Sequence, residues 1–298
     1  MNLTRAVRLL AVTCLFALLN GSRGGIARGS VVTDNPAAWN LTFEDDFSGT
    51  SLDGAKWANR LPGPRNSAIN TPDAVSVGDG VLTIKTYTDN GIHYTGMIGS
   101  QGKFEQTYGY FEARVKFHTS PGQWSAFWLT SPIYDQGTGN PGFYGTEIDI
   151  TEHRAVNNNN NPILNRFVSA VHWDTYSDGA HQQTAQTFSN VPNLGNDSWH
   201  TFALKWSPAG YAFYYDETLM WTVDQAISAR DEYMILSSEV RQDEWAGHIP
   251  DAGYGSLAST VTNLQVDYVR VYQSVPEPTA LALVCGVSPF LLRRSRKR

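Results

Sequence analysis

Short runs of alternating apolar and polar residues recur along the sequence, and glycine- and proline-containing turns stand beside them. The clearest runs lie at residues 81–87, 110–117, 211–215 and 266–272. Alternation with a period of two is typical of strands that bury one face, and no long amphipathic helix is evident. Many strands at short spacing indicate antiparallel pairing. We therefore predict an all-β fold, an antiparallel β-sandwich or jelly roll.

The N-terminus has the three parts of a secretory signal peptide, which we place at residues 1–27. Two arginines supply the positive charge, residues 9–19 the apolar segment, and residues 25–27 a small-residue cleavage site. The apolar segment is short for a bilayer span, which favours cleavage over anchoring. We expect residues 28–274 to form one exported domain, extracellular or on the cell envelope.

The C-terminal segment 275–298 has a different pattern. Val-Pro-Glu-Pro is followed by an apolar stretch and then by Arg-Arg-Ser-Arg-Lys-Arg. This order resembles the PEP-CTERM sorting signal of certain Gram-negative bacteria, which implies a membrane protease of the exosortase type as a partner that removes the tail. The basic end fits the positive-inside rule. A plain short C-terminal anchor is the alternative.

The net charge of residues 28–274 excludes some classes of binding partner, and the positions of the cysteines bear on whether this domain contains a disulfide. Eight of the 22 Lys and Arg residues lie outside this range, as does one of the 28 Asp and Glu residues, which leaves 14 basic and 27 acidic residues and a net charge of −13. This balance argues against nucleic acid and anionic membranes as partners, whereas local basic residues could still meet a sulfated polysaccharide. Both cysteines, Cys14 and Cys285, lie in the terminal segments. A domain of this size needs no disulfide, and we expect a monomer.

Three carboxylates gather in the segment Glu147-Ile148-Asp149-Ile150-Thr151-Glu152. In a strand, Glu147 and Asp149 share a face, whereas Glu152 would face the other way. One extra residue, a β-bulge near Ile150-Thr151, would return Glu152 to the shared face. Paired carboxylates on one face are the chemistry of glycoside hydrolysis. The alternative is an exposed acidic strand edge.

Tryptophan content supports a carbohydrate substrate, because indole rings stack on the apolar faces of sugars. We expect Trp124, Trp128 and Trp245 to bind substrate. Trp124 and Trp245 are the better candidates because glycine and polar residues flank them. A core position is the alternative for each of them.

These segments together resemble glycoside hydrolase family 16. Residues 147–152 match its bulged signature E-x-D-x-x-E. Similar segments occur in the family's order at residues 45–47, 52–57, 109–114, 122–129, 198–206 and 266–272. The resemblance covers nearly all of residues 28–274.

The resemblance implies a β-jelly roll with a concave substrate cleft and an endo-acting, retaining hydrolase of β-linked polysaccharide. Carried onto this sequence, Glu147 is the nucleophile, Glu152 the general acid/base, and Asp149 the residue that orients and biases the nucleophile. A covalent glycosyl-enzyme forms, and the chemistry requires no cofactor. Negative neighbours raise a carboxyl pKa, so Glu147 and Asp149 are expected to keep Glu152 protonated.

Further residues receive roles from the same resemblance. His172 aligns with a histidine beside the catalytic strand, where it would hydrogen-bond near the acids; a core histidine is the alternative. Asp46 and Asp267 fall where a structural calcium on the convex side would find ligands.

Substrate choice stays open between β-1,3-glucan and a marine galactan. The bulged signature groups the chain with laminarinase-like, agarase-like and carrageenase-like members. The Gly-Gly pair of laminarinase-like members is missing from residues 236–240. Glu239 stands there instead, which puts β-1,3-glucan in doubt and makes Glu239 a candidate substrate-binding residue. Two other functions also remain: a non-catalytic carbohydrate-binding or matrix protein on the same fold, and a transglycosylase that uses the same intermediate.

Overall fold

The computed structural model describes residues 31–177, 179–195 and 197–275. The predicted signal peptide and nearly all of the predicted sorting tail lie outside this range. Within it, no helix is long and apolar enough to cross a membrane.

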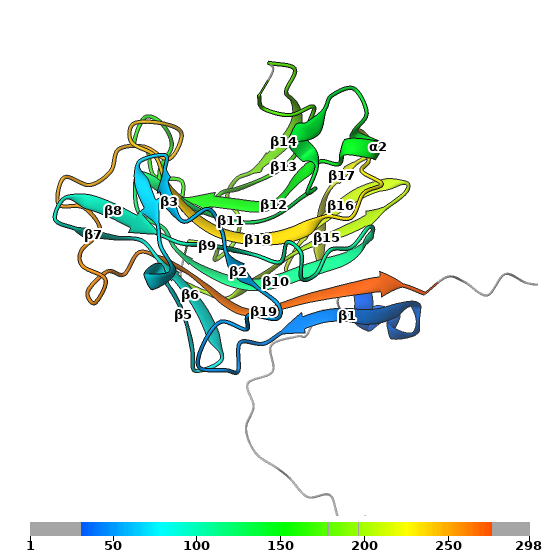
Figure 1. Ribbon diagram of the computed structural model, residues 1–298, viewed down its shortest axis with the longest axis horizontal. Helices are drawn as coiled ribbons and strands as arrows, with labels where there is room; N and C mark the ends of the chain where they lie inside the picture. Colours follow the sequence, from blue (N-terminus) through cyan, green and yellow to red (C-terminus); the bar gives the residue numbers. More distant parts are fainter. Residues whose placement is uncertain (1–30, 178, 196, 276–298) are drawn as a thin grey trace, which may run out of the picture.

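Two large antiparallel sheets are stacked face to face (Figure 1). The outer sheet has the strand order β17 (Thr218–Val223), β16 (Gly210–Tyr215), β15 (His200–Ser207), β10 (Gly109–His118), β19 (Asn263–Ser274), β6 (Val81–Lys85) and β5 (Val75–Gly78). β1 (Trp39–Asp45) also pairs with β19. The four alternating runs singled out in the sequence begin or lie within β6, β10, β16 and β19, which confirms the all-β prediction.

The inner sheet carries the concave face of the molecule. Its order is β14 (Gln182–Phe188), β13 (Phe167–Trp173), β12 (Glu147–Arg154), β11 (Gln123–Thr130), β18 (Tyr233–Val240), β9 (Met97–Gly99) and β2 (Ala58–Asn59). In Figure 1 its free face is turned upward, with α2 and β14 at one side and the hairpin that contains β3 at the other.

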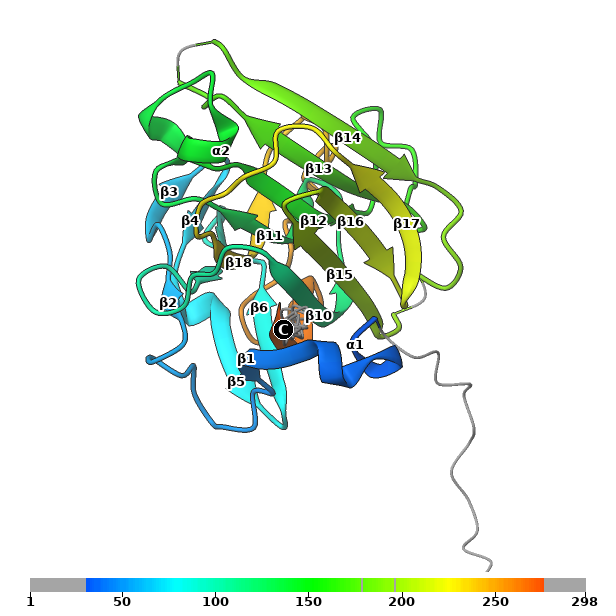
Figure 2. The same ribbon diagram turned by 90° about the vertical axis from the view of Figure 1, so that its right-hand side faces the viewer.

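Smaller elements border these sheets. A four-stranded sheet runs in the order β3 (Gly63–Arg65), β4 (Ala68–Asn70), β8 (Ile92–Thr95) and β7 (Tyr87–Asp89). The short helices are α1 (Val31–Asp34), η1 (Pro36–Ala38), η2 (Pro72–Ala74), η3 (Tyr134–Gln136) and α2 (Pro141–Tyr144). Figure 2 shows α1 and β1 on the outer side, away from the concave face.

The hydrophobic core fills the space between the two large sheets. Ile148 and Ile150 of β12 point into it and meet residues such as Phe111 of β10 and Leu204 of β15, all of which are buried. Burial of these side chains is the main stabilising term of such a sandwich. Because successive side chains alternate across a strand, the same packing turns Glu147 and Asp149 to the opposite, concave face.

Candidate active site

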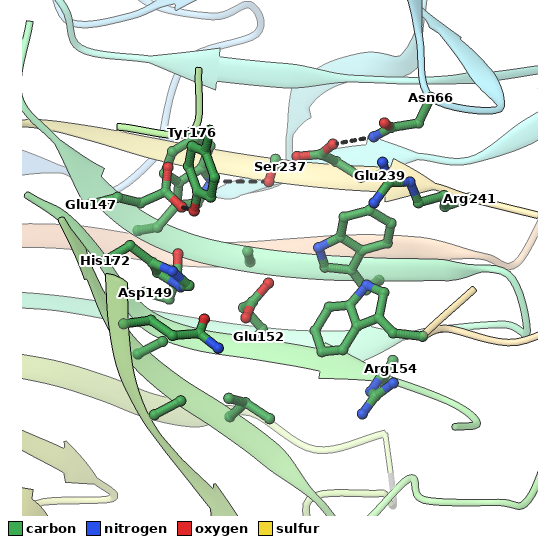
Figure 3. Close-up of a pocket in the computed structure, with 18 of the residues that line it drawn as sticks. Asn66, Glu147, Asp149, Glu152, Arg154, His172, Tyr176, Ser237, Glu239 and Arg241 are labelled. Atoms are coloured by element: carbon green, nitrogen blue, oxygen red, sulfur yellow. Dashed lines mark hydrogen bonds and ion pairs between the residues drawn. The ribbon is translucent and has the colours of Figure 1, made fainter. Parts of the chain in front are cut away.

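A β-bulge in β12 brings the three predicted acids together. Asp149 pairs with Ala170 of β13 and Glu152 with Val168, so two residues of β12, Ile150 and Thr151, stand opposite a single residue of β13. The register with β11 shifts at the same place. The bulge predicted from the sequence is therefore present, and it returns Glu152 to the face that carries Glu147 and Asp149 (Figure 3).

The concave face holds a cavity of about 640 Å³. Side chains of β11, β12, β13, β14 and β18 line it, and the hairpin of β3 and β4 adds Arg65 and Asn66 at its rim. All three acids contact this cavity. A cavity of this volume, open on a concave sheet face and lined by acids and tryptophans, has room for sugar rings of a polysaccharide.

Glu147 lies at one end of the triad, under Tyr176 from the loop after β13. The Tyr176 hydroxyl donates a hydrogen bond of 2.6 Å to Glu147 Oε1. Burial and the neighbouring Asp149 raise the pKa of Glu147 to about 8, while His172 and the Tyr176 hydrogen bond act in the opposite direction. Tyr176 and His172 thus favour the ionised form that a nucleophile requires.

Asp149 is buried and is bonded to the next strand. His172 Nε2 lies 3.0 Å from Asp149 Oδ2. Burial lowers the pKa of His172, but its hydrogen bond to Asp149 and the charges of Asp149 and Glu147 outweigh burial and raise it. An imidazolium here offsets part of the negative charge of the triad. The hydrogen bonding near the acids that was expected of His172 is present.

These three groups also come close enough to chelate a cation. Ligand atoms of Glu147, Asp149 and His172 all lie within 4.8 Å of one another. The direct bond between His172 and Asp149 and the Tyr176 bond to Glu147 already account for this closeness. The cluster therefore needs no metal to explain its geometry.

Glu152 has a different environment from Glu147. Its carboxyl group has no hydrogen-bond partner among the described residues, and Arg154 is the cation that acts on it. Burial first, and then the charges of Asp149 and Glu147, raise its pKa well above the usual value. A carboxyl group kept protonated at neutral pH is what a general acid requires. The direction predicted for Glu152 from the sequence is the direction found.

The three predicted tryptophans all line the cavity. Trp128 lies opposite Asp149 in the β11–β12 pair, and its Nε1 donates a 3.1 Å hydrogen bond to Ser237 Oγ. Trp124 lies opposite Arg154 in the same pair of strands, two positions beyond Glu152, and meets Trp245 edge to face with ring centroids 5.6 Å apart. Indole surface therefore lines the cavity from the level of Asp149 to beyond Glu152.

Glu239 reaches the cavity, but both of its oxygens are already bonded. Arg65 donates from Nε (2.8 Å) and Nη2 (3.1 Å), and Asn66 Nδ2 donates at 2.9 Å. The fork geometry makes this a strong, oriented pair. Glu239 thus holds Arg65 and Asn66 at the rim of the cavity, and its binding to substrate stays a prediction.

Of the two residues proposed for calcium, Asp267 lies on the outer sheet and Asp46 directly after its strand β1, and neither lines the cavity. Asp46 follows β1, is exposed, and accepts a hydrogen bond from the Ser48 backbone N–H. Asp267 of β19 pairs with Arg114 at 2.5 Å. Each carboxylate thus has a partner within the protein, and the calcium site stays a prediction.

Several residues of the site could not be recognised from sequence. Tyr176 and His181 belong to a loop with no motif, and Arg65 lies over eighty residues before the acids. Arg154 follows the signature by two positions, so the alternation of the strand could have placed it on the cleft face once the bulge was assumed. Its guanidinium stands 4.0 Å from the centre of the Trp245 ring.

Comparison with known proteins decides the family. A family model described as "Beta-porphyranase A-D, GH16 domain" matches residues 39–274. The chain belongs to glycoside hydrolase family 16. The resemblance drawn from its motifs is thereby confirmed.

Relatives within this family act on different polysaccharides, as their names state. Glucan endo-1,3-beta-glucosidase A1 of Niallia circulans is 28% identical over 279 residues, which cover 80% of this chain and 38% of that protein. Beta-porphyranase D of Zobellia galactanivorans is 27% identical over 269 residues, 79% of this chain and 60% of the relative. The chain thus spans about half the length of these curated relatives. The solved laminarinase of Rhodothermus marinus is 25% identical with a TM-score of 0.63, covering 80% of this chain and 98% of that one.

Proposed function

We propose that this family 16 chain is an exported, endo-acting, retaining glycosidase that hydrolyses a β-linked polysaccharide. One observation carries the proposal: the bulge in β12 places Glu147 and Glu152 on the same face of the cleft. The Tyr176 hydrogen bond and His172 favour the ionised form of Glu147 against the effect of burial, whereas burial and negative neighbours raise the pKa of Glu152. Retaining glycosidases require such a pair about 5–5.5 Å apart. The open cavity and its tryptophans suit internal cleavage of a polymer.

The proposed reaction has two steps. Glu147 attacks the anomeric carbon while the glycosidic C–O bond breaks, and the Glu152 proton passes to the leaving oxygen. Water then attacks the same carbon, Glu152 takes the proton of that water, and the Glu147 carboxylate is released. Asp149 and its His172 partner hold Glu147 in place and limit the charge that builds up beside it.

For the substrate we propose a β-linked galactan that carries sulfate groups. Three guanidinium groups, those of Arg65, Arg154 and Arg241, line a cleft in an otherwise acidic domain. Arg65 pairs with Glu239 and Arg241 with Glu244. Arg154 stacks on Trp245 instead and takes part in no ion pair within the part of the chain that the structure describes.

An arginine held against an aromatic face, with its hydrogen-bond donors free, fits an anionic group on a sugar that stacks nearby. The similarity to Beta-porphyranase D and to the porphyranase domain model supports this choice over β-1,3-glucan. Export and removal of the tail by an exosortase-type protease remain part of the proposal, on the sequence patterns alone.

The test is release of reducing ends from laminarin, lichenan, agarose, porphyran and carrageenan by the full-length protein. We expect activity on a sulfated galactan, its loss in Glu147→Ala, and its retention in the surface variant Glu44→Ala. Normal turnover by Glu147→Ala would overturn the assignment of the nucleophile. Activity confined to laminarin or lichenan would overturn the galactan proposal, and silence combined with retention on a polymer would indicate a binding protein.

A further inference from the structure

A closed ring of contacts links the nucleophile to two residues of the loop between β13 and β14. Tyr176 bonds to Glu147 and stacks on His181, with ring centroids 4.4 Å apart and an interplanar angle of 22°. His181 Nε2 lies 2.9 Å from Nδ1 of His172, whose own Nε2 bonds to Asp149. Asp149 and Glu147 are neighbours on β12, which closes the ring.

The contact between the two histidines determines which of their ring nitrogens carry protons. A cationic His172 donates from Nε2 to Asp149 and from Nδ1 to His181, which therefore must offer a lone pair at Nε2. His181 then carries its single proton on Nδ1. The electrostatics agree, because burial and the charge of His172 lower the pKa of His181, whereas the pKa of His172 is raised.

The loop is tied down on the far side from the acids. Asp174 accepts hydrogen bonds from the Gly139 backbone N–H (2.7 Å) and from Gln182 Nε2 (2.9 Å). Thr175 Oγ1 donates to Asp135 Oδ1 at 2.8 Å. Asp174 and Thr175 both adopt positive φ, 64° and 47°. For a β-branched residue this conformation is strained, and such strain persists only where surrounding contacts enforce it.

We propose that Tyr176 and His181 are positioning residues of the nucleophile. Tyr176 fixes one carboxylate oxygen of Glu147, and His181 Nε2 accepts a hydrogen bond from His172 Nδ1–H, which keeps His172 positively charged against Asp149. The loop thereby sets the charge and orientation of Glu147 from outside the signature strand. This inference rests on the proposed function, in which Glu147 attacks the sugar.

The titratable groups of this ring and those that face it all contribute to the pH dependence of activity. Besides Tyr176 and the two histidines, they are Glu147, Asp149 and Glu152 from β12, Tyr134 and Asp135 from η3, Asp174 from the loop, and Glu239 from β18. Arg65 of the β3–β4 hairpin also acts on Glu147, from outside the ring. The other groups are acidic or neutral, so His172 is the cation within the ring itself. Loss of its cationic form should raise the pKa of Glu147.

Two substitutions of His181 separate hydrogen bonding from stacking. H181F keeps an aromatic ring against Tyr176 but offers no acceptor to His172. H181Q loses the ring but can place an amide oxygen near the position of Nε2. We expect H181F to move the acidic limb of the kcat/KM profile upward by about one pH unit, with KM nearly unchanged, and H181Q to restore the wild-type limb.

Y176F should move the same limb upward and reduce kcat roughly tenfold, because it removes a hydrogen bond to a charged group.

A titration by NMR makes the result independent of turnover. The imidazole signals of His172 should show a pKa about one unit lower in H181F than in the wild-type protein and in H181Q. An unchanged His172 titration in H181F, or equal shifts of the acidic limb in H181F and H181Q, would overturn the proposal. Silence of the wild-type protein on every polymer would instead count against the proposed function, while the His172 titration would still decide whether the histidine pair is coupled.

Discussion

Replacing Glu152 by alanine should slow cleavage of substrates whose leaving group needs a proton, and should spare the first step for substrates whose leaving group needs none. The leaving oxygen of a polysaccharide needs a proton, and Glu152 is the protonated acid beside it because burial and the charges of Asp149 and Glu147 raise its pKa. General acid catalysis contributes about 10²–10⁴-fold. A sugar is a poor leaving group, so we expect kcat/KM on polymer to fall by about 10³-fold or more, equivalent to about 4 kcal/mol.

The assay compares the polymer with an aryl glycoside whose leaving group departs without protonation. With the aryl substrate, the rate at which the glycosyl-enzyme forms should change little in Glu152→Ala. Added azide should speed the breakdown of the glycosyl-enzyme, because azide replaces the water that Glu152 would activate. The alkaline limb of the pH profile should also disappear. The control is Glu112→Gln, which alters a buried carboxyl that also has a raised pKa but lies on the outer sheet. Equal losses on both substrates, or an alkaline limb that survives in Glu152→Ala, would refute the assignment.

Three further outcomes follow from the same contacts. Burial raises the pKa of Glu232 from 4.5 to about 7, so between these pH values the folded chain holds a proton that the unfolded chain releases. The free energy of unfolding should therefore fall by about 3 kcal/mol as pH rises from 4.5 to about 7. Denaturant titrations of Glu232→Gln should lack that decline. Asp149→Asn removes a charge that raises the pKa of Glu152, so initial rates should drop without vanishing and the alkaline limb should move to lower pH. Trp245→Ala removes the face on which Arg154 stacks, so KM for polymer should rise about tenfold in steady-state kinetics while kcat changes little.

The fold class could be predicted because it depends on a local periodicity. The run that became β10 alternates along its length, with Phe111, Ala113 and Val115 turned to the core. This pattern depends only on residues that are close in sequence, so it can be recognised without knowing which strands pair with one another. The order of strands in each sheet is different, because pairs such as β1 with β19 join residues more than two hundred positions apart.

The central acids could also be placed from sequence, since a single strand holds all three. Alternation put Glu147 and Asp149 together, and the spacing to Glu152 required one extra residue, which the β12–β13 register contains. The pKa direction of Glu152 followed from the same closeness. The partners of Glu239, Arg65 and Asn66, could not be predicted because they come from a distant hairpin.

The sequence by itself thus determined the strand pattern, the bulge and the family's signature acids, because each depends on residues within a few positions of one another. The surroundings of those acids depend instead on how distant parts of the chain fold together. Tyr176 and His181 reach Glu147 and His172 through a loop, and Arg65 reaches the rim from another sheet. Hydrogen bonds and pKa shifts act over a few ångströms in space, and the folding of the chain sets which residues come within that distance.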